Sequence, residues 1–169
     1  LMSEFRAKIK SKNLFKISMI KDQDSLVIFK REIMNNRYAA TIVATQMEEP
    51  YGYGRIIQSH QHQQSHPHTS AYQQSHTSAL RIVEEKDCTE EEKLVKLVNC
   101  GIYAFKNEFL CQNLPKINNN NAQQEYYLTS IFSGGEEKVG LFEIPAEKQY
   151  EVCGINTAEQ LEEMRFKTI

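Results

Sequence analysis

The chain of 169 residues has no tryptophan, only 7 glycines and 4 prolines, and no marked excess of charge of either sign. Its 20 basic and 22 acidic residues leave a net charge of −2, so nothing predicts a nucleic-acid groove or a basic membrane-binding arm. No apolar run is long enough to cross a bilayer, and no signal peptide opens the chain. These absences predict a cytoplasmic protein with neither a nucleic-acid nor a membrane partner.

The cysteines are also few, and they are scattered without a CxxC pair or the spacing of a zinc site. We therefore expect reduced cysteines that mostly pack in the interior, rather than a disulfide framework or a metal centre. A hydrophobic content of 40% is enough for one core, and we interpret residues 1–169 as a single domain. The four cysteines are Cys88, Cys100, Cys111 and Cys153.

Hydrophobic patterns predict short strands that alternate with short helices. Strands are expected at 14–20, 38–45, 79–85, 97–105 and 139–144, and helices at 26–35, 107–114 and 126–132. Capping boxes at Thr89 and Thr157 predict a helix that extends to about Leu97 and a last helix near the C-terminus. This order predicts an α/β fold in which helices flank a mixed sheet.

Residues 58–79 differ from the rest in composition, since they contain all five histidines amid glutamine and serine. Such low complexity predicts a disordered insertion at the tip of a hairpin. Metal binding by the two closely spaced pairs, His60 with His62 and His66 with His68, stays open as an alternative.

Two further stretches contain residues that could form a binding site. The run at 118–129, NNNNAQQEYYLT, opens with asparagines that favour a shaped loop and continues with a carboxylate, two aromatic rings and a hydroxyl. This combination is typical of a wall of a sugar site, although a surface loop leading into a helix is the plainer alternative. In PYGYGRI, two glycines flank Tyr53 and permit a sharp turn and close approach of a ligand, or simply an ordinary turn.

The asparagine-rich stretch closely resembles the NNNAQGEYYLTD segment of bacterial bifunctional N-acetylglucosamine-1-phosphate uridyltransferases, in their N-terminal pyrophosphorylase domain. Gln124 stands at the family's glycine, and Ser130 stands at its closing aspartate. Four more segments resemble the family in the same order: PYGYGRI matches DPTGYGRI, IVEEKDCT matches IVEEKDAT, VNCGIY matches INTGIY, and GIN at 154–156 matches the start of GVNN. The resemblance extends over most of the chain from about residue 25 onward.

The resemblance implies a transferase that makes UDP-N-acetylglucosamine and pyrophosphate from UTP and N-acetylglucosamine 1-phosphate, for peptidoglycan synthesis and cell wall biogenesis. The implied partners are therefore the substrate N-acetylglucosamine 1-phosphate and the product UDP-N-acetylglucosamine. Asn156 is the implied ligand of a catalytic Mg²⁺, whose hardness suits a carbonyl oxygen. The implied sugar-binding residues are Gly54, Glu84, Asn99, Tyr127 and Thr129, and no catalytic residue is assigned.

Several parts of the family pattern have no counterpart in this sequence. These are the glycine-rich LAAGxGTRM loop that holds the triphosphate, the DxPL aspartate that is the second protein ligand of Mg²⁺, and the C-terminal hexapeptide-repeat domain. We therefore expect an incomplete, Rossmann-like nucleotide-diphospho-sugar transferase fold that keeps the sugar-binding half. Whether the chain is an enzyme on its own stays open.

Two alternatives are a non-catalytic module that binds a sugar nucleotide and a protein-interaction module built on the insertion. A sheet edge exposed by the missing half would also favour self-association, or pairing with a chain that supplies the nucleotide-binding half.

Overall fold

The structure, a computed structural model, describes residues 38–58, 73–77, 80–133, 139–152 and 162. The strand expected at 14–20, the helix expected at 26–35 and the capping box at Thr157 lie outside the described residues. So do the two histidine pairs of the insertion and Cys153. Because both ends of the chain are outside, the single-domain assignment over 1–169 stays a prediction.

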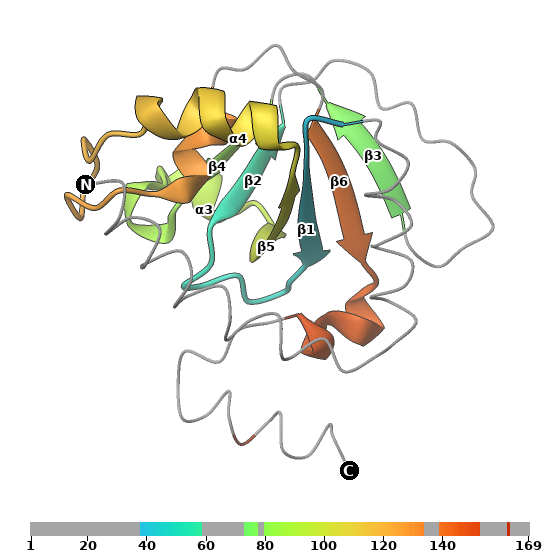
Figure 1. Cartoon of the computed structure of the whole chain (residues 1–169). Helices are drawn as coiled ribbons and strands as arrows, with labels where there is room; N and C mark the ends of the chain where they lie inside the picture. The colour runs from blue at the N-terminus through green and yellow to red at the C-terminus, as the bar shows by residue number, and fades with distance from the viewer. Residues whose placement is uncertain (1–37, 59–72, 78–79, 134–138, 153–161, 163–169) are drawn as a thin grey trace.

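The described strands form one six-stranded mixed sheet in the order β3-β6-β1-β5-β2-β4 (Figure 1). Strands β1 and β6 run parallel, and the other neighbouring pairs are antiparallel. The mixed sheet confirms the predicted α/β class. The strands are β1 (Ala40–Gln46), β2 (Arg55–Gln58), β3 (Gln73–Thr77), β4 (Leu80–Val83), β5 (Leu97–Phe105) and β6 (Val139–Ile144).

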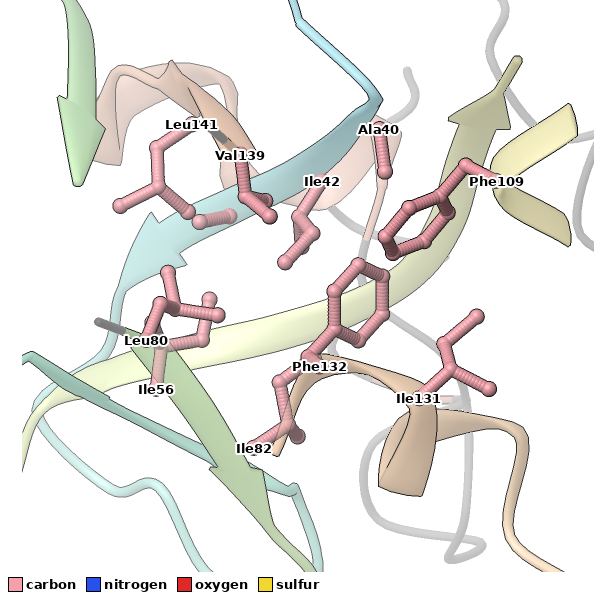
Figure 2. Close-up of a cluster of buried hydrophobic side chains, with 11 residues drawn as sticks. Ala40, Ile42, Ile56, Leu80, Ile82, Phe109, Ile131, Phe132, Val139 and Leu141 are labelled. Carbon is pink, nitrogen blue, oxygen red and sulfur yellow. The ribbon is translucent and has the colours of Figure 1, made fainter. Parts of the chain in front are cut away.

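Strand β1 lies at the centre and is buried on both faces, as its unbroken run of small and β-branched residues predicts. Alternate residues point to opposite faces, so Ile42 packs on one side of the sheet and Val43 on the other. Phe109 of helix α4 (Asn107–Asn113) and Phe132 of the 3-10 helix η3 (Leu128–Phe132) join Ile42 in the larger cluster (Figure 2). The second face is packed by Val43, Cys100, Ile102, Phe142, Ile144 and Val152.

The predicted capping box at Thr89 is confirmed. Glu92 N donates to Thr89 Oγ1 at 3.2 Å, and Thr89 N donates to Glu92 Oε2 at 2.8 Å. The helix that follows, α3 (Glu90–Lys93), is shorter than the predicted one, which extended to Leu97. Leu94 is 79% exposed, so another turn would bury no apolar face, and tertiary packing supplies most of the stability of a short helix.

Two other short elements connect these pieces: η1 (Glu85–Asp87) follows β4, and η2 (Leu114–Lys116) follows α4. The helix expected at 126–132 is instead η3, which begins two residues later, while η4 (Ala146–Glu151) follows β6. No helix within the described ranges has the length and apolar character to cross a membrane.

The insertion departs from expectation in two places. Sequence composition predicts disorder throughout 58–79, but Gln58 is the last residue of β2 and Gln73–Thr77 form strand β3. This strand pairs antiparallel with β6, with Gln73 opposite Glu143 and Thr77 opposite Val139. The prediction is therefore wrong for Gln58 and for the five residues of β3. The physical reason is that β6 has backbone groups to pair beyond β1, and strand pairing requires only a partner backbone, not an apolar one.

Candidate functional site

The segment before β2 begins with a tight turn. Tyr53 N donates to Pro50 O at 3.2 Å, and Gly52, the third residue of the turn, has φ +83°. A positive φ at this position is the mark of a type II turn, which favours glycine. The sharp turn predicted from PYGYGRI is therefore confirmed. The turn brings the chain directly to the buried Gly54 at the start of β2.

Gly54 lies against the carboxylate of Glu84. A Cβ at position 54 would lie 3.3 Å from Glu84 Oε2 and 3.2 Å from Ile82 Cγ2. The glycine thus leaves space for a side chain of this same protein. Glu84 comes at the end of β4, which is the antiparallel neighbour of β2, so the sheet itself places the two residues together.

Glu84 is also held from the other side. Thr129 Oγ1, which is buried in η3, donates to Glu84 Oε1 at 2.8 Å. Tyr127 precedes η3, and its pKa is raised to about 12 by burial and by the negative charges of Asp87 and Glu84. A tyrosine hydroxyl is protonated at neutral pH, so Tyr127 can donate a hydrogen bond. Its oxygen is buried and lies close to the Asp87 carboxylate.

Asn99 reaches the site from β5. Its backbone N donates to Gly54 O at 2.9 Å, and its side chain lies in a bulge where Gly101 has φ +70°. Asn99 Oδ1 accepts from Gly101 N at 2.9 Å, while Nδ2 donates to the Tyr103 hydroxyl at 2.7 Å. These bonds explain how a strand accommodates a buried asparagine. They still leave the amide one N–H and one lone pair for a ligand.

The asparagine run forms the shaped loop that was predicted. Asn121 Oδ1 accepts from Gln123 N at 3.2 Å and from Glu125 N at 3.1 Å, and Asn118 Oδ1 accepts from the amide two residues on. Such bonds are the reason asparagine favours turns. Asp87 Oδ1 accepts from Ala122 N at 2.8 Å and so attaches this loop to η1, next to Glu84.

Gln124 is the one non-glycine residue with a positive φ, +53°, among those described. We predict that Gln124→Gly raises the free energy of unfolding by about 1 kcal/mol, because a side chain in the left-handed region is strained. Urea unfolding of both proteins measures the difference. Gln124→Ala is the matched control and should bring no such gain. An equal gain from alanine would contradict backbone strain as the cause and indicate the glutamine side chain instead.

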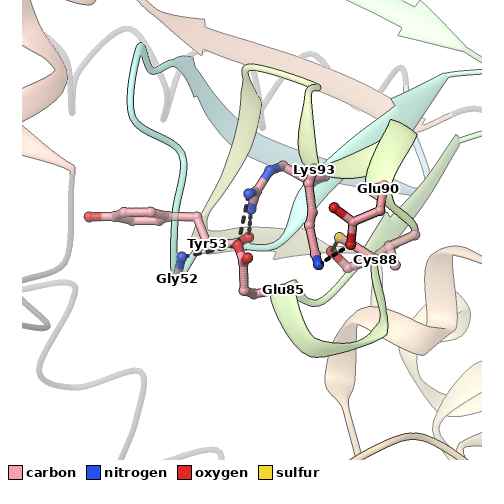
Figure 3. Close-up of polar contacts among 8 residues, drawn as sticks. Gly52, Tyr53, Glu85, Cys88, Glu90 and Lys93 are labelled. Carbon is pink, nitrogen blue, oxygen red and sulfur yellow. Dashed lines mark hydrogen bonds and ion pairs between the residues drawn. The ribbon is translucent and has the colours of Figure 1, made fainter.

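Sequence reasoning missed three residues that organise the site: Arg55, Glu85 and Asp87. Arg55 is 2% exposed, and its Nη2 lies 2.7 Å from Glu85 Oε2. Gly52 and Tyr53 of the turn lie beside Glu85 (Figure 3). The available signal was an arginine at the start of an apolar strand, a position where an unpaired charge would be costly.

The cysteine beside this ion pair does not have the environment of a nucleophile. Cys88 Sγ donates to Val83 O at 3.5 Å. Burial raises the pKa of the Cys88 thiol, and the positive charge of Arg55 opposes this shift only in part. Because the thiolate is the reactive form, a protonated Cys88 at neutral pH is a packing residue. The cysteines within the described segments, Cys88, Cys100 and Cys111, are all free thiols.

The predicted sugar residues thus converge: Gly54, Glu84, Asn99 and Thr129 are joined by contacts, and Tyr127 adjoins them through η3. Asn156 lies outside the described residues, and its role as an Mg²⁺ ligand stays a prediction. Within the described ranges, no three acidic, histidine or cysteine side chains are grouped to hold a metal ion.

The mixed α/β sheet and its strand-end site define the chain as part of a Rossmann-like transferase fold. It is 39% identical over 125 residues to a probable UDP-N-acetylglucosamine pyrophosphorylase of Acanthamoeba polyphaga mimivirus. It is also 42% identical over 129 residues to the bifunctional protein GlmU of Clostridium kluyveri, and 39% identical over 131 residues to that of Alkaliphilus metalliredigens. The chain is a homologue of these proteins and matches part of a GlmU-like domain.

The matches cover 72–76% of this chain, but only 43% of the mimivirus protein and 24–25% of the two GlmU proteins. The chain therefore spans less than half the length of the relatives that it matches. A scan against protein-family models finds no match.

Proposed function

We propose that this domain binds the sugar part of UDP-N-acetylglucosamine or N-acetylglucosamine 1-phosphate. The observation that carries the proposal is the convergence of Glu84, Gly54 and Thr129 from three separate segments of the chain. Thr129 holds the Glu84 carboxylate through Oε1, and Oε2 is left as an acceptor for sugar hydroxyls beside a glycine backbone. The name of the mimivirus homologue, a probable UDP-N-acetylglucosamine pyrophosphorylase, supports the same ligand class.

Within this proposal each residue has a distinct role. Glu84 accepts hydrogen bonds from sugar hydroxyls, and Thr129 holds its carboxylate in place. Asn99 uses its remaining N–H and lone pair toward the acetamido group. Tyr127 donates from its buried hydroxyl.

The reaction of the relatives, as the resemblance implies it, is the finer part of the proposal. A phosphate oxygen of the sugar 1-phosphate forms a bond to the α-phosphorus of UTP, and the bond from that phosphorus to the departing pyrophosphate breaks. The protein's contribution to such a transfer is mostly alignment and charge stabilisation. The 169 residues contain no glycine-rich triphosphate loop. We therefore propose that this domain binds the sugar, and that turnover requires a phosphate-binding segment supplied from elsewhere.

Three further proposals rest on the resemblance: an Mg²⁺ ion held by Asn156, a cytoplasmic location, and a part in the synthesis of cell-wall precursors. When bound, Mg²⁺ would stabilise charge on the phosphates.

Removing the charge of Glu84 tests the binding proposal directly. We expect Glu84→Gln to weaken binding of UDP-N-acetylglucosamine by roughly tenfold, because a charged acceptor contributes about 1.5–3 kcal/mol per hydrogen bond. Isothermal titration calorimetry on the folded chain measures the affinity, with UDP-glucose as the ligand control. Glu91→Gln, an exposed change in the neighbouring α3, should leave the affinity unchanged. A wild-type chain that is folded and binds neither nucleotide would overturn the proposal.

Strand β3 favours a second candidate function. It is an edge strand whose outer backbone groups have no paired strand among the described residues. A module that binds another protein chain by strand pairing, or that self-associates, would use this edge. The two candidate functions can be told apart. The first requires that the protein bind a sugar nucleotide, whereas strand pairing at β3 does not.

A further inference from the structure

The two residues at the centre of the proposed sugar site are each followed by a member of one ion pair. Arg55 follows Gly54 at the start of β2, and Glu85 follows Glu84 at the start of η1. Strands β2 and β4 pair antiparallel with Arg55 opposite Val83. Arg55 thus belongs to the last residue pair of the two strands, and the ion pair connects it to Glu85, two residues beyond the end of β4.

The guanidinium of Arg55 and the carboxylate of Glu85 together hold the turn. Arg55 Nη2 lies 2.7 Å from Glu85 Oε2, and the same oxygen accepts from Gly52 N at 3.1 Å. Arg55 Nη1 also donates to the backbone oxygen of Tyr53. Figure 3 shows Gly52 and Tyr53 grouped around Glu85 in this way. One buried cation thus ties the turn, the start of β2 and η1 together.

Stability alone is a poor explanation for this arrangement. Arg55 is 2% exposed and Glu85 only 19% exposed, and Arg55 Nε is buried without a hydrogen-bond partner among the described residues. A buried charge with an unmet donor costs free energy, and well-packed apolar residues often replace a buried ion pair without loss of stability. What the pair does provide is a fixed spacing between two segments.

We propose that the Arg55–Glu85 ion pair is a positioning device for the sugar site. It holds the turn and η1 at the spacing that lets the Glu84 carboxylate lie against Gly54 and within reach of Thr129. Neither Arg55 nor Glu85 contacts the ligand, so both act through Glu84. This inference rests on the proposed sugar-binding function and assigns the positioning of Glu84 to an ion pair outside the site.

The double variant Arg55→Met with Glu85→Met tests the proposal. It removes both charges together, so we expect a folded protein with a Tm close to that of the wild type. Its affinity for UDP-N-acetylglucosamine should nevertheless fall by roughly tenfold or more, which is typical when a residue that orients a ligand-contacting group is lost. Calorimetry measures the affinity, and thermal unfolding measures the Tm.

Conservative single variants keep the test decisive if the double variant does not fold. Glu85→Gln retains an oxygen that can accept from Gly52 N and Arg55, so it should keep most of the wild-type affinity. Arg55→Lys keeps the positive charge but lacks the planar, forked guanidinium that reaches both Tyr53 O and Glu85. Its affinity should therefore lie closer to that of the double variant than the affinity of Glu85→Gln does. Arg81→Met is the control, because it removes the Arg81–Glu92 ion pair on β4 and should leave affinity unchanged.

A readout without ligand separates this inference from the proposed function. We expect the Gly52 amide to exchange its hydrogen roughly tenfold faster in the double variant, and the NMR signal of the Glu84 carboxyl carbon to shift. If the wild type binds no UDP-N-acetylglucosamine, the proposed function fails, and these ligand-free signals alone decide the positioning role. A folded double variant with wild-type affinity, or with an unshifted Glu84 signal, would overturn it.

Discussion

Gly140→Val is expected to lower the free energy of unfolding by about 3 kcal/mol, the upper end of the usual cost of overpacking a core. Gly140 lies in β6 between β1 and β3, and the ring of Tyr38 covers it. A Cβ at position 140 would lie 2.5, 2.8 and 2.9 Å from three carbons of that ring. Contacts this short force the ring or the strand to move. Urea unfolding followed by circular dichroism measures the loss.

A double-variant cycle separates the ring contact from a general intolerance of side chains in β6. Gly140→Ala alone should cost about 2 kcal/mol. In a Tyr38→Ala background the same change should cost clearly less, since the ring is no longer there to be displaced. Strictly additive losses would show that Tyr38 is not what restricts position 140.

Gly54→Ala is expected to weaken binding of UDP-N-acetylglucosamine by between about tenfold and a hundredfold, which corresponds to roughly 1.4–2.8 kcal/mol. The new methyl group would lie 3.3 Å from Glu84 Oε2, so the carboxylate must retreat from its place between Gly54 and Thr129. The methyl group would also lie 3.2 Å from Ile82 Cγ2 in the core, so we expect a smaller loss of stability alongside the loss of affinity. Calorimetry and thermal unfolding of the same preparations measure the two effects.

Gly52→Ala is the matched control for this experiment. Position 52 has φ +83° but open space around a Cβ, so alanine should strain the turn by about 1–2 kcal/mol while placing no atom near Glu84. The two variants should therefore show opposite patterns. Gly54→Ala should lose mainly affinity, and Gly52→Ala mainly stability. Equal affinity losses would point to a disturbed turn, and not to crowding of Glu84.

Local sequence signals predicted β1, β5 and β6 well because burial and backbone preference agree there. The limits of β5 and β6 match the predicted ranges 97–105 and 139–144, and β1 is shifted by only one or two residues. Predictions failed where packing overrode the local pattern. The helix at 126–132 became the shorter η3, because the chain before it stays extended at Tyr127 and places Thr129 against Glu84.

The site was predicted in part, through the resemblance of separate segments to one family. That comparison identified Gly54, Glu84, Asn99 and Thr129, which the structure brings together, and Asn156, which lies outside the described residues. It did not identify Arg55 and Glu85. Their side chains meet across 30 positions of sequence through a buried contact, and no local pattern carries that information.

The sequence by itself determined the α/β class, the central position of β1, the capping box at Thr89 and the turn-forming asparagines. Each of these depends on residues within a few positions of one another, where propensity and hydrogen bonding are local. Only the tertiary structure decided that β3 pairs with β6, that Glu84 lies against Gly54, and that Arg55 holds the turn. These contacts join distant segments, so they depend on the sheet order that brings the segments together and on the space left between packed side chains.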